Sequence, residues 1–80
     1  MSNWKSAGIT MDGQPFRLGG LNVWRHKWSR LAEEAVELPH PSYPKQLHRM
    51  WQYEIQDGNK RVRFAAGELS AGVWGFYVHA

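Results

Sequence analysis

Alternation of apolar and polar residues on both sides of one turn dipeptide constrains this chain more than any other feature of its sequence. Over residues 51–55, Trp, Tyr and Ile alternate with Gln and Glu, which is the period of a strand with one buried face. Asp57-Gly58 follows, and this dipeptide accepts the positive φ angles of a type I′ turn. Residues 60–66 alternate again, with Val, Phe and Ala on one side and Arg on the other. Together these segments predict a β-hairpin.

The predicted hairpin has a register that can be checked pair by pair. If Asp57-Gly58 is its two-residue loop, apolar side chains face one another across the ladder and an acid faces a base. The expected pairs are Tyr53 with Val62, Trp51 with Phe64 and Glu54 with Arg61. This register places the apolar residues of both strands on one face of the sheet.

A third strand is expected to complete a meander at the C-terminal end. Gly72 can supply the left-handed residue of a three-residue loop at 70–72, so that the chain folds back. The expected neighbours are Val78 beside Phe64 and Phe76 beside Ala66. Because residues 73–78 are apolar nearly throughout, we expect this strand to be central or covered on both faces. The predicted core residues share one face: Trp51, Tyr53, Ile55, Val62, Phe64, Trp74, Phe76 and Val78.

The N-terminal part repeats the hairpin pattern more weakly. Asp12-Gly13 can turn a strand near 8–11 into one near 16–18. Pro15 then has to lie at a sheet edge or at a position that makes no ladder hydrogen bond. Gly19-Gly20 is expected to end the second strand.

The segment from 22 to 38 fits two structures. Its large apolar residues recur at steps of three and four, and Asn22 suits the N-cap of a helix. The residues of this stripe are Trp24, Trp28, Leu31, Ala35 and Leu38. Against a helix, basic residues at 25–27 would crowd its N-terminal end and glutamates its C-terminal end, which the helix dipole disfavours. We therefore predict a strand over 21–28, with at most a helical turn or two over 29–35.

Residues 39–44 cannot form a regular element, because three prolines remove hydrogen-bond donors and restrict the residues before them. We expect this segment to run extended over the surface. Pro41, Tyr43 and Pro44 lie in a PxxP match, a preformed shape that aromatic grooves of other proteins accept. These three residues are the predicted partner-binding loop.

Length and composition predict one domain over residues 1–80 with a thin core. Five Trp, three Tyr and three Phe supply its bulk, and the absence of cysteine excludes disulfides and thiolate metal sites. We predict a mainly β fold, a small antiparallel barrel or two-layer β domain of five or six short strands with a C-terminal three-stranded meander. The alternative is an α+β domain with one helix within 22–38 packed on the meander.

No residue pattern points to catalysis, a cofactor or a metal. The four histidines, at 26, 40, 48 and 79, lie far apart, and none has a partner at the short spacing of recurrent zinc motifs. Glu33, Glu34 and Glu37 form an acidic cluster typical of a solvated face. No phosphate-binding glycine loop or nucleophile elbow occurs. We therefore predict a protein that is not an enzyme and that holds no cofactor or metal.

One surface fits an anionic ligand. The outward face of the meander is expected to carry a ring among cations, an arrangement typical of single-stranded nucleic-acid binding. Its residues are Arg61, Arg63, Tyr77 and His79, and Arg25, Lys27 and Arg30 form a second basic strip. The formal net charge of +3 permits such a ligand but is also ordinary for solubility.

The favoured function is a small binding or protein-interaction module. The proline loop supports a protein partner, and an open edge of the meander would allow a homodimer. Residues 1–13 lack the apolar run of a secretory signal, and no stretch approaches the roughly 20 apolar residues of a membrane span. We expect a cytoplasmic protein without a membrane partner. Single-stranded nucleic-acid binding is the alternative function.

Overall fold

All regular structure in the described residues is β-strand. The computed structural model describes residues 3–11, 14, 16–23, 27–31 and 34–79. The strands are β1 (Trp4–Met11), β2 (Arg17–Leu18), β3 (Leu21–Asn22), β4 (Ser29–Arg30), β5 (Val36–Pro39), β6 (Leu47–Asp57), β7 (Lys60–Ser70) and β8 (Val73–His79). The prediction of a mainly β fold with a C-terminal meander is confirmed.

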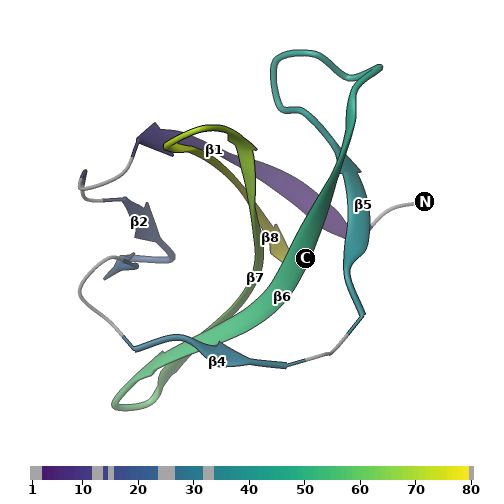
Figure 1. Cartoon of the computed structure of the whole chain (residues 1–80). Helices are drawn as coiled ribbons and strands as arrows, with labels where there is room; N and C mark the ends of the chain where they lie inside the picture. Colours follow the sequence, from purple (N-terminus) through teal and green to yellow (C-terminus); the bar gives the residue numbers. More distant parts are fainter. Residues whose placement is uncertain (1–2, 12–13, 15, 24–26, 32–33, 80) are drawn as a thin grey trace.

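Most strands belong to one antiparallel sheet with the order β1-β8-β7-β6-β4 (Figure 1). β5 pairs with the start of β6, and β2 and β3 form a small separate hairpin. The sheet curves without closing into a barrel, and the β2–β3 hairpin lies against its hollow side (Figure 1). The fold is thus the two-layer form of the prediction. Its central strands are longer than expected, since β6 and β7 each span 11 residues.

The β6–β7 hairpin forms where the alternation predicted it, but around a different turn. Asp57 pairs with Lys60, so the two-residue loop is Gly58-Asn59. Gly58 has a φ of +61° and no described non-glycine residue has a positive φ, as in a type II′ turn with glycine first. The predicted pairs are therefore wrong: Tyr53 faces Phe64, Trp51 faces Ala66 and Glu54 faces Arg63. Because each partner is displaced by two residues, every side chain keeps its predicted face.

The β7–β8 ladder has the predicted register. Phe64 lies opposite Val78, and Ala66 lies opposite Phe76. Gly72 adopts a φ of +75° at the turn, the left-handed conformation expected of it. The predicted three-residue loop at 70–72 is wrong, since Ser70 pairs with Val73 and the loop is Ala71-Gly72. β8 is central, between β7 and β1, and its residues are buried on both faces of the sheet.

One hydrophobic core fills the hollow side of the sheet. Its buried residues come from the meander and from the segment around β2 and β3: Leu18, Leu21, Val23, Ile55, Phe64, Ala66 and Phe76. Trp28 packs over them, with its ring centroid 5.0 Å from that of Phe64 and its indole N–H donating to the Val23 carbonyl. Most of the predicted core residues belong to this cluster. Trp51 instead carries the Arg30 guanidinium over its ring, 4.0 Å from the centroid.

A second core lies on the opposite face, where alternation predicted a solvent-exposed surface. Leu38, Met50, Ala65 and Tyr77 are buried together there. β5 brings Leu38 to this face because its four residues pair with the first four of β6. Both faces of the meander are therefore partly covered, each by a segment from the first half of the chain.

Two predictions for the first half of the chain are wrong. β1 pairs with β8, and β2 pairs with β3, so strands near 8–11 and 16–18 do not form a hairpin. Gly19-Gly20 is the turn of the β2–β3 hairpin, with φ angles of +57° and +87°. Two glycines adopt this pair of angles without the steric cost of a side chain. Asp12, Gly13 and Pro15 lie outside the described residues.

The helical alternative for 22–38 is also wrong, since its described residues contain no helix. Ser29 and Arg30 pair with β6, which excludes the helical turn expected to begin at Ser29. The backbone amide of Leu31 donates to the Gln52 carbonyl at 3.0 Å, so this segment satisfies its polar groups on the edge of β6. Only Leu21–Asn22 of the strand predicted over 21–28 is a strand, and residues 24–26 and 32–33 lie outside the described part.

Residues 36–50 form a projecting hairpin, which we call the β5–β6 ribbon. It consists of β5, the loop 40–46 and the first four residues of β6. In Figure 1 this loop extends beyond the rest of the sheet. The loop end of the ribbon thus presents surface that neither core covers, while Leu38 and Met50 at its base belong to the second core.

Candidate functional site

The most exposed large apolar side chains of the described residues lie at the loop end of the β5–β6 ribbon. Tyr43 is 60% exposed and Leu47 is 61% exposed. A groove of about 350 Å³ is lined by residues 42–46, which include Tyr43 and Pro44 of the predicted partner-binding loop. Pro41, the third predicted residue, is half-buried beside it. The structure therefore brings the predicted loop residues and Leu47 to one end of the molecule.

The loop of the ribbon is held by its own hydrogen bonds. The backbone amide of His40 donates to the Gln46 carbonyl at 2.7 Å, and that of Gln46 donates to the Tyr43 carbonyl at 2.9 Å. The Tyr43 amide donates to the His40 carbonyl at 3.1 Å, and the Ser42 amide donates to Nδ1 of His40 at 3.0 Å. The expectation that this segment runs extended is wrong, because it closes on itself. Tyr43 is consequently presented in one defined conformation.

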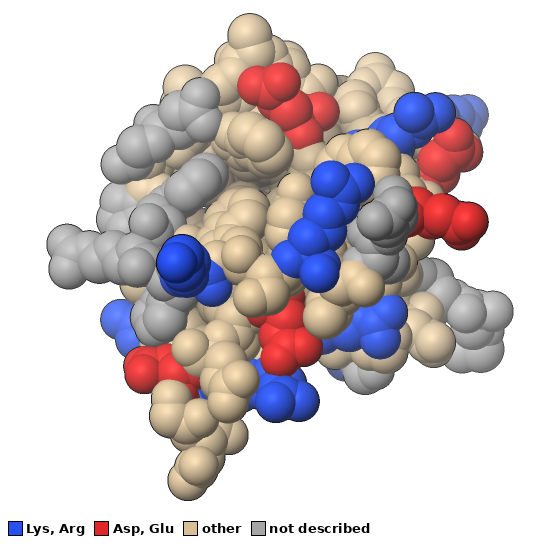
Figure 2. All heavy atoms as spheres, turned by 60° about the horizontal axis from the view of Figure 1, so that its bottom comes forward, with Lys and Arg blue, Asp and Glu red and all other residues tan. Residues whose placement is uncertain are grey.

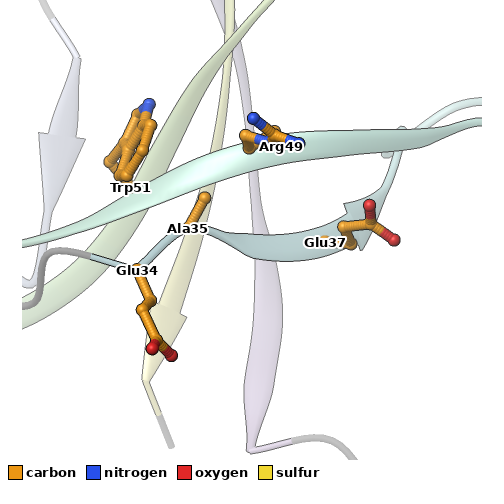
Figure 3. Close-up of a pocket in the computed structure, with 5 residues that line it drawn as sticks. All are labelled: Glu34, Ala35, Glu37, Arg49 and Trp51. Atoms are coloured by element: carbon orange, nitrogen blue, oxygen red, sulfur yellow. The ribbon is translucent and has the colours of Figure 1, made fainter.

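One face of the ribbon continues from the loop toward the body of the sheet. Leu47, Arg49 and Trp51 share this face, since alternate residues of a strand point to the same side. A shallow cavity of about 470 Å³ opens beside them, lined by Glu34, Ala35, Glu37, Arg49 and Trp51. In Figure 3, Trp51 and Arg49 point to the same side, and the Glu34 carboxylate points away from Arg49. Apolar, cationic and anionic groups are mixed here, which suits a polypeptide better than a polyanion.

Tyr77 does not form the exposed stacking ring that the outward face was predicted to carry. It is buried in the second core, and its hydroxyl donates to the Pro39 carbonyl at 2.6 Å. Burial raises the pKa of Tyr77 above its ordinary value of 10.0. The prediction of an exposed ring is therefore wrong, because β5 covers the face from which Tyr77 was expected to project.

The other three residues of that predicted face are near the surface but engaged. Arg61 Nε lies 2.7 Å from Oε1 of Glu54, and Arg63 donates to Oε1 of Gln52 at 2.5 Å. His79 packs edge-on against Trp4, with ring centroids 5.1 Å apart. On the face drawn in Figure 2, positive and negative side chains are interspersed. In the second basic strip, Arg25 lies outside the described residues, Lys27 is exposed and Arg30 covers Trp51.

Two histidines that are eight residues apart in sequence lie together at the base of the loop. The ring centroids of His40 and His48 are 5.5 Å apart, and the Tyr43 ring lies 4.9 Å from that of His40. Within the described part of the chain, no group of three or more His, Cys, Asp or Glu could hold a metal ion. His26 is not among the described residues.

Sequence reasoning missed Leu47 and the histidine pair. β6 begins at Leu47, but the alternation of apolar and polar residues breaks at Arg49 and Met50, so the prediction began the strand at Trp51. The histidine pair has no local signal, since it depends on the loop closing. The stacking of Arg30 on Trp51 was missed for the same reason, as only strand pairing brings these residues together.

Comparisons with known proteins leave the function to be argued from these residues. No protein-family model, curated protein or solved structure matches the chain. Among the described residues, no helix is long and apolar enough to cross a membrane.

Proposed function

We propose that this protein is a non-enzymatic protein-interaction module that contacts its partner through the loop end of the β5–β6 ribbon. The observation that carries the proposal is the exposure of Tyr43 and Leu47 on a projecting hairpin whose loop is hydrogen-bonded. Exposed apolar groups gathered on a defined surface are typical of interaction sites.

The energetics of the loop favour this function. A tyrosine ring buries a large area at low conformational cost, and tyrosine is enriched among residues that dominate binding energy. Because four hydrogen bonds already order the loop, binding has less entropy to lose. The mixed charges of Arg49 and Glu37 beside the loop would form a polar rim.

Recovery of the partner from cells that make this protein tests the proposal, with matched variants of the full chain as bait. Tyr43→Ala combined with Leu47→Ala should reduce the recovered partner by at least about tenfold, as expected for loss of central contacts. The control is Ile9→Ala combined with Met11→Ala on β1, where both side chains are also exposed. The control should recover the partner as the wild type does. Equal recovery with both double variants would refute the ribbon as the binding site.

A second candidate function, single-stranded nucleic-acid binding, is favoured by one cluster on the outward face. Arg63 lies 6.0 Å from the centroid of the Trp4 ring, which also contacts His79. If this cluster binds nucleic acid, anisotropy titrations with mixed-sequence oligonucleotides at two salt concentrations should show strong salt dependence. Arg61→Ala combined with Arg63→Ala should then reduce the log–log slope by roughly one to two. Absence of binding at low salt would exclude this function.

A further inference from the structure

The loop that presents Tyr43 depends on the protonation state of His40. Nδ1 of His40 accepts a hydrogen bond from the Ser42 backbone amide at 3.0 Å. A neutral imidazole can accept at one nitrogen, whereas a protonated imidazole carries N–H groups on both nitrogens and accepts at neither. The hydrogen bond to the Ser42 amide therefore requires neutral His40.

His48 adds a second group that opposes protonation. Its Nε2 is buried and has no hydrogen-bond partner among the described residues. Protonation would place an N–H donor and a positive charge at this site without an acceptor, which is costly. The centroids of the two imidazole rings are 5.5 Å apart, so protonation of both would also bring two like charges together.

The described side chains that face or contact the two rings are apolar or aromatic. His48 lies opposite Leu38 on β5, and the Tyr43 ring packs on His40. Glu37 lies opposite Arg49 and hence on the other face of the ribbon. No Asp or Glu of the described residues joins the two histidines in a group of three. Lys45, the other charged residue of the loop, is exposed and adds a further positive charge.

We propose that the His40–His48 pair makes the β5–β6 loop a pH-sensitive switch for the binding surface. While His40 is neutral, the Ser42 amide is bonded to it and Tyr43 is held in place. Histidine is the side chain that changes charge between about pH 5 and 8. Acidification through this range breaks the bond to Ser42 and so loosens the part of the loop next to Tyr43, while the three backbone hydrogen bonds of the loop do not depend on protonation. This inference rests on the proposed function for its biological meaning, but the switch itself can be measured without a partner.

The test is a pH titration of the ¹⁵N-labelled full chain by NMR between about pH 8 and 5. The Ser42 and Tyr43 amide signals should move with one midpoint in the histidine range. The protection factor of the Ser42 amide, which corrects for the slower intrinsic exchange at lower pH, should fall as the pH falls. The Val62 amide, near the turn at the other end of the β6–β7 hairpin, serves as a remote control and should not follow this midpoint. If the Ser42 signal were independent of pH, the switch would be refuted.

His40→Asn is the matched variant. An Asn side-chain oxygen accepts from the backbone amide two residues on, as in an Asx-turn, and it does not titrate. This variant should keep the loop ordered at both ends of the pH range and remove the pH dependence of Ser42. A His40→Asn loop that still opened on acidification would overturn the role of His40. His48→Gln should leave the Ser42 transition in place, since His40 alone accepts from the Ser42 amide.

Binding measurements separate this inference from the proposed function. If the switch and the function are both right, partner recovery falls between pH 7.5 and 5.5 for the wild type but not for His40→Asn. If NMR shows the loop transition while the Tyr43 and Leu47 variants bind normally, the switch stands and the proposed binding site is wrong.

Discussion

The two ends of β6 carry similar side chains in opposite environments. Ile55, near the C-terminal end of the strand, is 0% exposed, whereas Leu47 at its start is 61% exposed. Ile55 pairs with Val62 of β7 and is covered by the segment 18–23, while Leu47 pairs with Pro39 of β5. Hydrophobicity alone therefore does not decide whether a residue of this protein lies in the core. In this fold the residues that stabilise the sheet and the residues offered for binding lie in separate regions.

The largest expected difference between the two regions comes from truncating one apolar residue in each. Phe64→Ala should lower the free energy of unfolding by about 3–5 kcal/mol, because it leaves a cavity in a fully buried site. Leu47→Ala should lower it by less than about 0.5 kcal/mol, as expected at an exposed position. Urea unfolding of both variants measures the two values. Similar losses for both would show that the ribbon belongs to the folding core.

A smaller effect is expected where the ribbon and the sheet body meet. A Cβ added to Gly67 would lie 2.7 Å from the Arg49 carbonyl oxygen and 2.7 Å from Cγ of Met50. Gly67→Ala should therefore destabilise the protein by about 1–3 kcal/mol through overpacking, and it should shift the NMR signals of the ribbon.

Gly58→Ala is the comparison for that variant. Nothing lies within 4 Å of a Cβ at Gly58, but its φ of +61° disfavours a side chain. Gly58→Ala should lower the free energy of unfolding by about 1 kcal/mol and leave the NMR signals of the ribbon unchanged. Ribbon signals that ignored Gly67→Ala would mean that β7 and the ribbon are not packed together.

The smallest expected effect concerns the hydroxyl that ties β8 to β5. Tyr77→Phe removes the donor to the Pro39 carbonyl and should cost about 0.5–1.5 kcal/mol at neutral pH. Because burial raises the pKa of Tyr77, the folded chain retains a proton above pH 10 that the unfolded chain loses. Wild-type stability should therefore fall as the pH rises above about 10.

Urea unfolding at neutral and alkaline pH, with Tyr77→Phe as the reference, isolates this contribution. The wild type should lose its advantage over the variant as the pH rises. An unchanged difference between wild type and variant at both pH values would contradict the buried, hydrogen-bonded phenol.

The hairpin and the loop show how far local patterns could predict this structure. The alternation over 51–66 was sufficient to place β6, β7 and their faces, because a strand has a period of two whatever its neighbours are. The alternation did not determine how the two strands are aligned. Gly58 can be the second residue of a type I′ turn, as predicted, or the first residue of a type II′ turn, as observed. The prolines at 41 and 44 lie in an irregular segment as predicted, whereas Pro39 is the last residue of β5 and pairs with Leu47. The closure of the loop depends on His40 contacting Ser42 and Gln46.

The candidate site was predictable only in part. Tyr43 and Pro44 were identified from their surroundings in sequence, and their exposure agrees with that prediction. Tyr77 was misplaced because alternation specifies which face a side chain takes but not whether another segment covers that face. Leu38 and Val36 from β5 cover it, and their position depends on long-range pairing with β6.

The sequence by itself determined the strand faces, the meander and the two glycines at which its C-terminal half turns. These features depend on side-chain alternation and on φ angles available to glycine, which are local properties of the chain. Only the tertiary structure decided that β1 joins β8, that β5 buries Tyr77 and that His40 lies against His48. Such contacts depend on which segments meet to bury apolar surface and satisfy backbone hydrogen bonds, and residues far apart in sequence contribute jointly to that outcome.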